Sequence, residues 1–174
     1  MKKLFVIALA VLCIGALAAP CFAEALTPQL CKEKTIEAAK LLETEGSAAL
    51  EKIKDPNGPF RFANGEGYIW VHNLDGIMVM HPIKPSLDGK SVIDMRDVNG
   101  VYLFAAMNEI AEDYGSGWVP YSWPKPGEEK SSPKVSFVML AHGPDGDYVA
   151  GCGMYDVTAD EIKKDFPNDA IYED

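Results

Sequence analysis

Three side chains that could bind a small molecule lie within one short segment, YSWPKPGEEKSSPKVSF, which runs from Tyr121 to Phe137. Both ends of this segment alternate in polarity and carry aromatic residues, as β-strands do, and a polar, proline-rich loop separates them. The phenol of Tyr121, the indole N–H of Trp123 and the ammonium of Lys134 are all hydrogen-bond donors. The alternative is ordinary packing at a sheet edge with a solvated Lys134, so the elements around the segment are needed to choose between the two.

The first half of the chain predicts one helix and one hairpin. Thr27 followed by Pro28 is typical of a helix N-terminus, and apolar residues then recur near the helical period as far as Ile53. Gly46 lies inside this pattern and could bend or break the helix. The sequence GYIWVHNLDGIMVMHP predicts a β-hairpin that pairs residues 68–72 with 77–81. Residues 82–99 lack sustained periodicity and predict a loop that crosses the sheet.

The second half of the chain predicts a helix followed by three antiparallel strands. The helix opens after Asn99-Gly100 and stops at Gly115, the strands cover residues 118–123, 134–142 and 148–155, and Thr158 caps a short terminal helix. The order predicts an α+β fold with a five-stranded antiparallel sheet. The long N-terminal helix would cover one face of the sheet, while the loop and the second helix would cover a ligand pocket on the other face.

The N-terminus has the composition of a secretory signal peptide. Lys2 and Lys3 precede an apolar run, and small residues offer cleavage sites after Ala23 or Ala25. An uncleaved membrane anchor is the alternative, although the run is short for a membrane span. We therefore expect a signal peptide at 1–23 and one domain at 24–174 that is periplasmic or secreted and is not inserted in the membrane. Residues 24–174 keep all 26 acidic residues and 14 of the 16 basic ones, a net charge of −12. Such a charge disfavours nucleic-acid binding.

Two cysteines, Cys31 and Cys152, stay in the chain after this cleavage. In an oxidising compartment an even number of cysteines favours a disulfide, which here would tie the first helix to the last strand. Two separate buried thiols are the alternative. If Cys152 faces the first helix, strand alternation turns Gly151, Gly153 and Tyr155 toward the other face of the sheet. Two glycines within one strand leave space on that face, unless they only relieve the twist of the sheet.

The chain resembles the single Cache domains, which are extracytoplasmic PAS-like sensor modules of chemoreceptors and sensor kinases. The segments that carry the resemblance are GYIWVHNLDGIMVMHP, LDGKSVIDMRDVNG, GSGWVPYSWPKPGEEKSSPKVSF and VAGCGMYD, in this order. The resemblance covers the chain from the first helix to about Asp156. It implies the sheet and helix arrangement predicted above, with a pocket on the face away from the first helix. It also implies small organic acids such as acetate, propionate, lactate or pyruvate as ligands.

The resemblance also assigns roles to the polar residues near the strand ends. A short carboxylate needs a cation, one or two neutral donors and an apolar wall. Lys134 would supply the charge, with Arg96 as a second candidate cation, although Arg96 could equally pair with Asp94 or Asp97 at the surface. The other candidate ligand-binding residues are His81, Tyr121, Trp123, Ser136 and Tyr155.

The sequence is compatible with three classes of protein to different degrees. A small-molecule sensor that acts with a separate membrane receptor or transporter fits the resemblance best. The alternative is an interaction protein that docks a receptor or transporter without a ligand of its own. A small hydrolytic enzyme is the third class, but the sequence contains no Gly-x-Ser-x-Gly, His-Glu-x-x-His or Cys-x-x-Cys-His pattern. We therefore expect neither catalytic residues nor a metal or other cofactor.

Overall fold

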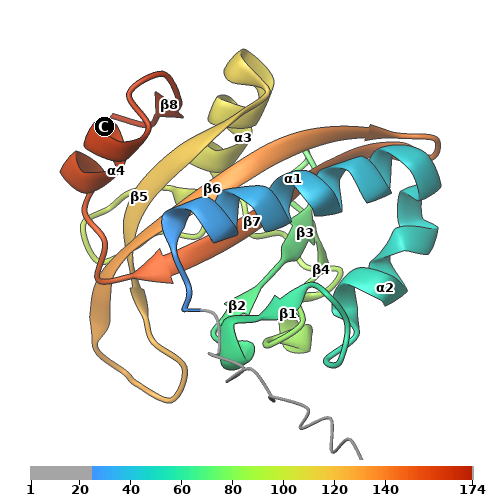
Figure 1. Cartoon of the computed structure of the whole chain (residues 1–174), viewed down its shortest axis with the longest axis horizontal. Coiled ribbons are helices and arrows are strands. Elements are labelled where there is room, and N and C mark those ends of the chain that lie inside the picture. Colours follow the sequence, from blue (N-terminus) through green and yellow to red (C-terminus); the bar gives the residue numbers. More distant parts are fainter. Residues whose placement is uncertain (1–24, 174) are drawn as a thin grey trace, which may run out of the picture.

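A computed structural model describes residues 25–173, which form a six-stranded sheet between two helical layers (Figure 1). The predicted signal peptide at 1–23 lies outside the described residues. Helix α1 crosses one face of the sheet, and α3 lies against the opposite face. This arrangement confirms the predicted α+β, PAS-like class.

The structure contains the helices and strands that the sequence predicts, together with several short elements. The helices are α1 (Pro28–Glu45), α2 (Leu50–Lys54), α3 (Leu103–Tyr114) and α4 (Ala159–Asp165), with 3-10 turns η1 (Gly46–Ala49), η2 (Ala63–Gly65) and η3 (Pro85–Leu87). The strands are β1 (Arg61–Phe62), β2 (Gly67–Tyr68), β3 (Trp70–His72), β4 (Met78–Met80), β5 (Ser116–Pro124), β6 (Ser131–Gly143), β7 (Gly146–Tyr155) and β8 (Ala170–Ile171).

The main sheet has the order β4-β3-β7-β6-β5-β8. All neighbours are antiparallel except β8, which runs parallel to β5 at the sheet edge. The sequence predicted five of these strands and missed β8, because two residues are too few to show a strand period. A separate two-stranded pair, β1 with β2, lies beside β7.

Gly46 breaks the first helix, which settles a point that the sequence left open. Its φ of 57° lies in the left-handed region that glycine tolerates, and its N–H donates to the carbonyl of Leu42. At the other end, the side chain of Thr27 accepts from the N–H of Leu30 at 3.1 Å, as the sequence predicted for the cap. The chain then turns through η1 and α2 before it reaches the sheet.

Strand alternation separates two cores, one on each side of the sheet. On the α1 side, Cys31 and Leu42 of the helix pack with Ala150 and Cys152 of β7. On the α3 side, Met107 and Ile110 of the helix belong to the core that includes Val119, Val138 and Trp70. The prediction that Gly151, Gly153 and Tyr155 face away from α1 is therefore confirmed.

The two glycines of β7 leave room for larger side chains that lie across the strand. A Cβ atom at Gly151 would overlap the indole ring of Trp70, which is its cross-strand partner in β3. A Cβ atom at Gly153 would overlap Cε of Lys134 and Oγ of Ser136, both from β6. Neither glycine has a positive φ, so close approach explains them and backbone strain does not.

Cys31 and Cys152 are free thiols in this structure, and both are completely buried. The predicted disulfide is therefore not formed here. The two side chains nevertheless interact: burial raises the pKa of Cys31, and a hydrogen bond with Cys152 raises it further. Their juxtaposition joins α1 to β7, as the sequence predicted, and makes bridging under oxidising conditions a testable proposal.

We expect Cys31 and Cys152 to form a disulfide when the protein is produced in an oxidising compartment. The denatured, unreduced protein should then show no titratable thiol among residues 24–174, and reduction should release two. Production in a reducing cytoplasm provides the matched control. Two free thiols per chain in the exported protein would contradict the bridge and leave a pair of buried, hydrogen-bonded thiols.

Replacing Gly151 with alanine should destabilise the fold, because the added methyl group meets a rigid ring packed in the core. Overpacking of this kind costs about 1–3 kcal/mol, which urea unfolding would resolve. Gly153→Ala is the comparison, since the added methyl group meets the flexible Cε of Lys134 and Oγ of Ser136 in place of a rigid ring. A Gly151→Ala variant as stable as the parent would show that Trp70 can leave its place over the strand.

Candidate functional site

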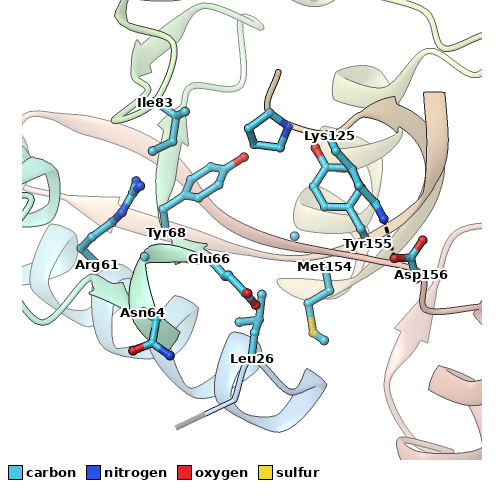
Figure 2. A pocket seen from close by; sticks show the side chains of 13 residues that line it. Leu26, Arg61, Asn64, Glu66, Tyr68, Ile83, Lys125, Met154, Tyr155 and Asp156 are labelled. Atoms are coloured by element: carbon cyan, nitrogen blue, oxygen red, sulfur yellow. Dashed lines mark hydrogen bonds and ion pairs between the residues drawn. The ribbon is translucent and has the colours of Figure 1, made fainter. Parts of the chain in front are cut away.

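Two neighbouring cavities lie at the ends of β5, β6 and β7 that are next to the β5–β6 loop and away from the β6–β7 turn. The inner cavity has a volume of about 240 Å³ and lies between the sheet, the start of α3 and residues 81–87. The outer cavity has a volume of about 540 Å³ and lies between β1, β2 and the end of β7 (Figure 2). Tyr68, Ile83, Pro126 and Tyr155 line both cavities. The larger cavity is the outer one, but the buried cation described next lines the inner one.

The ammonium of Lys134 is the dominant charge of the inner cavity. In the sheet register Lys134 lies between Tyr121 of β5 and Tyr155 of β7. Its Nζ lies 4.6 Å from the ring centroid of Tyr155 and 5.7–5.9 Å from those of Tyr68, Trp70 and Tyr121. Within residues 25–173 it forms no ion pair and no hydrogen bond, although only 3% of the residue is exposed. The cation therefore has aromatic faces around it but no counter-ion.

Burial changes the protonation equilibrium of this lysine. The pKa of Lys134 is lowered to about 8, chiefly because desolvation disfavours the charged form; Cys152 and Cys31 oppose this shift, and the charge of Lys84 adds to it. The group is still mostly protonated at neutral pH. A negative charge brought into the cavity would relieve this unfavourable burial, because it would pair with the ammonium.

His81 provides a neutral donor close to this cation. Burial, followed by the charges of Lys134 and Lys84, lowers the pKa of His81 to about 4, so the ring is neutral at pH 7. Its Nδ1 accepts from the backbone N–H groups of Ile83 and Lys84 at 3.2 and 3.1 Å. The proton of the neutral ring must then be on Nε2, which is left as a hydrogen-bond donor.

Tyr121 and Trp70 add two further polar groups to the inner cavity. The hydroxyl of Tyr121 shares a 2.9 Å hydrogen bond with Oγ of Ser136, which is completely buried and fixes the position of that hydroxyl. The Nε1–H group of Trp70 is buried and has no partner within the described residues. Buried donors are almost always satisfied in proteins, so this indole N–H indicates a partner that the chain itself does not supply.

Trp123 and Tyr155 close the cavity on the side of the proline-rich loop. Trp123 lines the inner cavity, with the ammonium of Lys84 5.1 Å from its ring centroid. The hydroxyl of Tyr155 donates to the carbonyl of Pro124 at 2.8 Å, and Lys125 pairs with Asp156 at 2.6 Å. These two bonds tie the loop between β5 and β6 to the end of β7, as Figure 2 shows for the ion pair.

Two predicted site residues, Arg96 and Ser136, line neither cavity; Ser136 contacts the site through Tyr121, whereas Arg96 lies apart from it. Arg96 is exposed, and its guanidinium stacks over the ring of Tyr102 at 3.9 Å. Asp97, its neighbour, turns inward and accepts from the backbone N–H groups of Asn99, Val101 and Ser122. The segment that crosses the sheet is thus held by Asp97 against β5, and this turn directs Arg96 outward.

The sequence interpretation missed the aromatic and apolar walls of the inner cavity. These residues are Tyr68, Trp70, Ile83, Leu87, Leu103 and Phe104. The signal available for Trp70 was its pairing with the bare Gly151, which depends on a register that the sequence does not fix. Leu103 and Phe104 open α3, and their period in the sequence predicted only a helix face in the core.

Comparison with known proteins gives consistent results. Over 131 residues the chain is 32% identical to the methyl-accepting chemotaxis protein McpP of Pseudomonas putida. This match covers 75% of this chain and 23% of McpP. Over 90 residues it is 30% identical to the sensor histidine kinase MctS of Rhizobium johnstonii. This match covers 52% of this chain and 19% of MctS. The chain thus matches only about a quarter or less of the length of these relatives.

Solved structures show the same fold. A Cache chemosensory domain described for its carboxylic acid recognition is 30% identical and has a TM-score of 0.59, covering 74% of this chain and 95% of that one. A periplasmic sensor domain of a chemotaxis protein is 35% identical with a TM-score of 0.52, covering 74% and 87%.

A family model described as Cache domain matches residues 32–169, which is most of the chain and includes every residue that lines the inner cavity. On the strength of this match and of the shared fold, the chain belongs to the Cache domain family of sensor modules.

Proposed function

We propose that this domain is an extracytoplasmic sensor that binds a short organic acid such as acetate, propionate, lactate or pyruvate in the inner cavity. The carboxylate pairs with the ammonium of Lys134, and His81, Tyr121 and Trp70 donate hydrogen bonds around it. Trp123 and Tyr155 form the walls, and Ser136 positions the hydroxyl of Tyr121. The recognition of carboxylic acids by a related Cache domain supports this choice of ligand.

The observation that carries the proposal is the buried ammonium of Lys134, which has no counter-ion among residues 25–173. A fold that only needed packing here would be more stable with an apolar side chain, because an unpaired buried charge is costly. Nearby donors without acceptors, above all the indole N–H of Trp70, also favour an anion. Carboxylates satisfy a cation and several donors at once through their two oxygens.

The size of the inner cavity agrees with small ligands. A volume of about 240 Å³ equals roughly eight waters at the ~30 Å³ that each occupies in the liquid. Acids of two to four carbons fit this space, and Leu103 and Phe104 of α3 offer an apolar wall for the carbon chain.

We further propose that residues 24–174 act as a single exported Cache domain with a separate membrane receptor or transporter. The periplasmic location of a similar sensor domain and the composition of the N-terminal segment support export. Among the described residues, no helix is both long and apolar enough to cross a membrane. The relatives McpP and MctS are a chemotaxis receptor and a sensor kinase, which suggests the kind of partner.

Replacing Lys134 with methionine should weaken carboxylate binding while keeping most of the side-chain volume. A hydrogen bond to a charged group contributes about 1.5–3 kcal/mol, so affinity for acetate or pyruvate should fall at least ten- to a hundredfold in titration calorimetry. The empty variant should be at least as stable as the parent, because a buried unpaired charge has been removed. A loss of affinity in this variant therefore cannot be attributed to unfolding.

Lys130→Met is the matched control, since Lys130 is exposed in the loop before β6. It should bind the same acids with unchanged affinity. The parent protein should also be stabilised by nearly 3 kcal/mol at a ligand concentration of about 100 times the dissociation constant. If no organic acid shifts the melting temperature of the parent, or if Lys134→Met binds as well as Lys130→Met does, the carboxylate proposal is wrong.

Carboxylate affinity should also depend on pH through Lys134. Because its pKa is about 8 in the empty protein, the ammonium is present below pH 8 and is lost above it. Affinity should be flat from pH 6 to 7.5, where His81 is already neutral, and should then fall by up to about tenfold per pH unit. Lys134→Met should remove this pH dependence. A parent protein whose affinity is constant up to pH 9.5 would exclude Lys134 as the cation.

The same group has the opposite effect on the stability of the empty fold. The unfolded chain keeps the lysine proton up to its usual pKa of about 10.4, whereas the folded protein releases it near pH 8. Between these values the unfolded state binds more protons, so the contribution of Lys134 to stability rises with pH. Binding and stability therefore change in opposite directions above pH 8.

A further inference from the structure

Arg61 is a second cation that lies close to the site and has no counter-ion. It belongs to β1 and lines the outer cavity, and within the described part of the chain it forms no ion pair. Its guanidinium carbon lies 5.8 Å from the ring centroid of Tyr68, and the ammonium of Lys134 lies 5.7 Å from the same centroid. One aromatic ring therefore contacts a free cation of each cavity.

Tyr68 lies between the two cavities and is held there by ring contacts alone. Its ring packs against Trp70 and His81, but no hydrogen bond to its hydroxyl is formed within residues 25–173. Tyr155, which lines both cavities as well, is anchored by its bond to the carbonyl of Pro124. A small shift of Tyr68 would therefore join the two cavities without breaking a hydrogen bond.

The remaining charges of the outer cavity single out Arg61 as its binding group. Lys125 is paired with Asp156, which leaves Glu66 as the unpaired carboxylate. In Figure 2 the carboxylate of Glu66 points toward Leu26, whereas Arg61 lies beside Tyr68. A group that extends from the inner cavity past Tyr68 thus meets the guanidinium first.

We propose that the two cavities form one extended site for dicarboxylates, in which Lys134 binds one carboxylate and Arg61 binds the other. This inference rests on the proposed function of the inner cavity and adds a second subsite to it. Arg61 would then determine specificity, because its planar guanidinium can bind both oxygens of a carboxylate.

The distance between the two cations limits the length of the ligand. The two distances to the Tyr68 centroid add to 11.5 Å, which is the largest separation that the two cations can have. Because the Arg61 distance is measured to the guanidinium carbon, charge-assisted bonds of about 2.8 Å at each end and a C–N bond of ~1.3 Å leave at most ~5 Å between the carboxylate oxygens. This span fits an acid of about four carbons, and a chain that bends around the ring needs one or two more.

Matched pairs of acids test the proposal directly. Succinate, glutarate and adipate would be compared with butanoate, pentanoate and hexanoate by titration calorimetry at low and moderate salt. The parent protein should bind at least one diacid about tenfold or more tightly than the monoacid of equal length. Arg61→Gln should abolish this preference and leave the affinity for monoacids unchanged. Glu66→Gln should strengthen diacid binding, because a repulsive charge is removed.

The outcomes separate this inference from the proposed function. If no monocarboxylate binds the parent protein, the proposed function itself fails. If monocarboxylates bind but no diacid is preferred, or if Arg61→Gln lowers both affinities equally, the second subsite is wrong. Tighter binding of 5-aminopentanoate than of glutarate would also overturn it, because Glu66 and not Arg61 would then recognise the far end of the ligand.

Discussion

One positive charge near the strand ends of a sheet face, unpaired within residues 25–173, determines the character of the inner cavity. Lys134 holds its ammonium among the rings of Tyr68, Trp70, Tyr121 and Tyr155, with no carboxylate in contact. Aromatic faces attract a cation, but by only about 2 kcal/mol or somewhat more at a buried position. Burial removes water from the ammonium and lowers the pKa of Lys134 to about 8. The position is thus costly for the empty fold and favourable for an anion.

The surrounding architecture explains how this charge can be kept in place. Tyr121 and Tyr155 flank Lys134 because they are its cross-strand partners. The register of β5, β6 and β7 therefore places two of the aromatic rings beside the ammonium. Gly153 gives the lysine chain room to lie across β7, and Gly151 does the same for Trp70. On the opposite face of the same strands, Phe137 and Cys152 pack in the cores beside α1. The same strands therefore form the pocket with one face and pack against α1 with the other.

The sequence predicted more of the fold than of the site. Thr27 and Thr158 caps, the hairpin turns and period-2 alternation are local signals, and the structure contains each element that they predicted. Lys134, Tyr121 and Tyr155 were identified because they lie near strand ends within motifs of a known family. Arg96 was misplaced because the turn of Asp97 decides its direction, and that turn depends on a contact with Ser122 far along the chain. Tyr68 and Trp70 join the site through pairing between distant strands, which no local pattern encodes.

The free energy of burying the Lys134 ammonium links ligand binding, pH dependence and the stability of the domain. A pKa lowered from 10.5 to about 8 corresponds to roughly 3 kcal/mol by which the empty protein disfavours the ammonium at neutral pH. A carboxylate that pairs with this group restores part of that energy, and the bound domain becomes more stable by an amount set by the ligand concentration and its dissociation constant. A more favourable environment for Lys134, such as a neighbouring aspartate, would stabilise the empty protein and weaken binding by the same argument. The absence of a carboxylate next to Lys134, within residues 25–173, is therefore a condition for recognising one from outside.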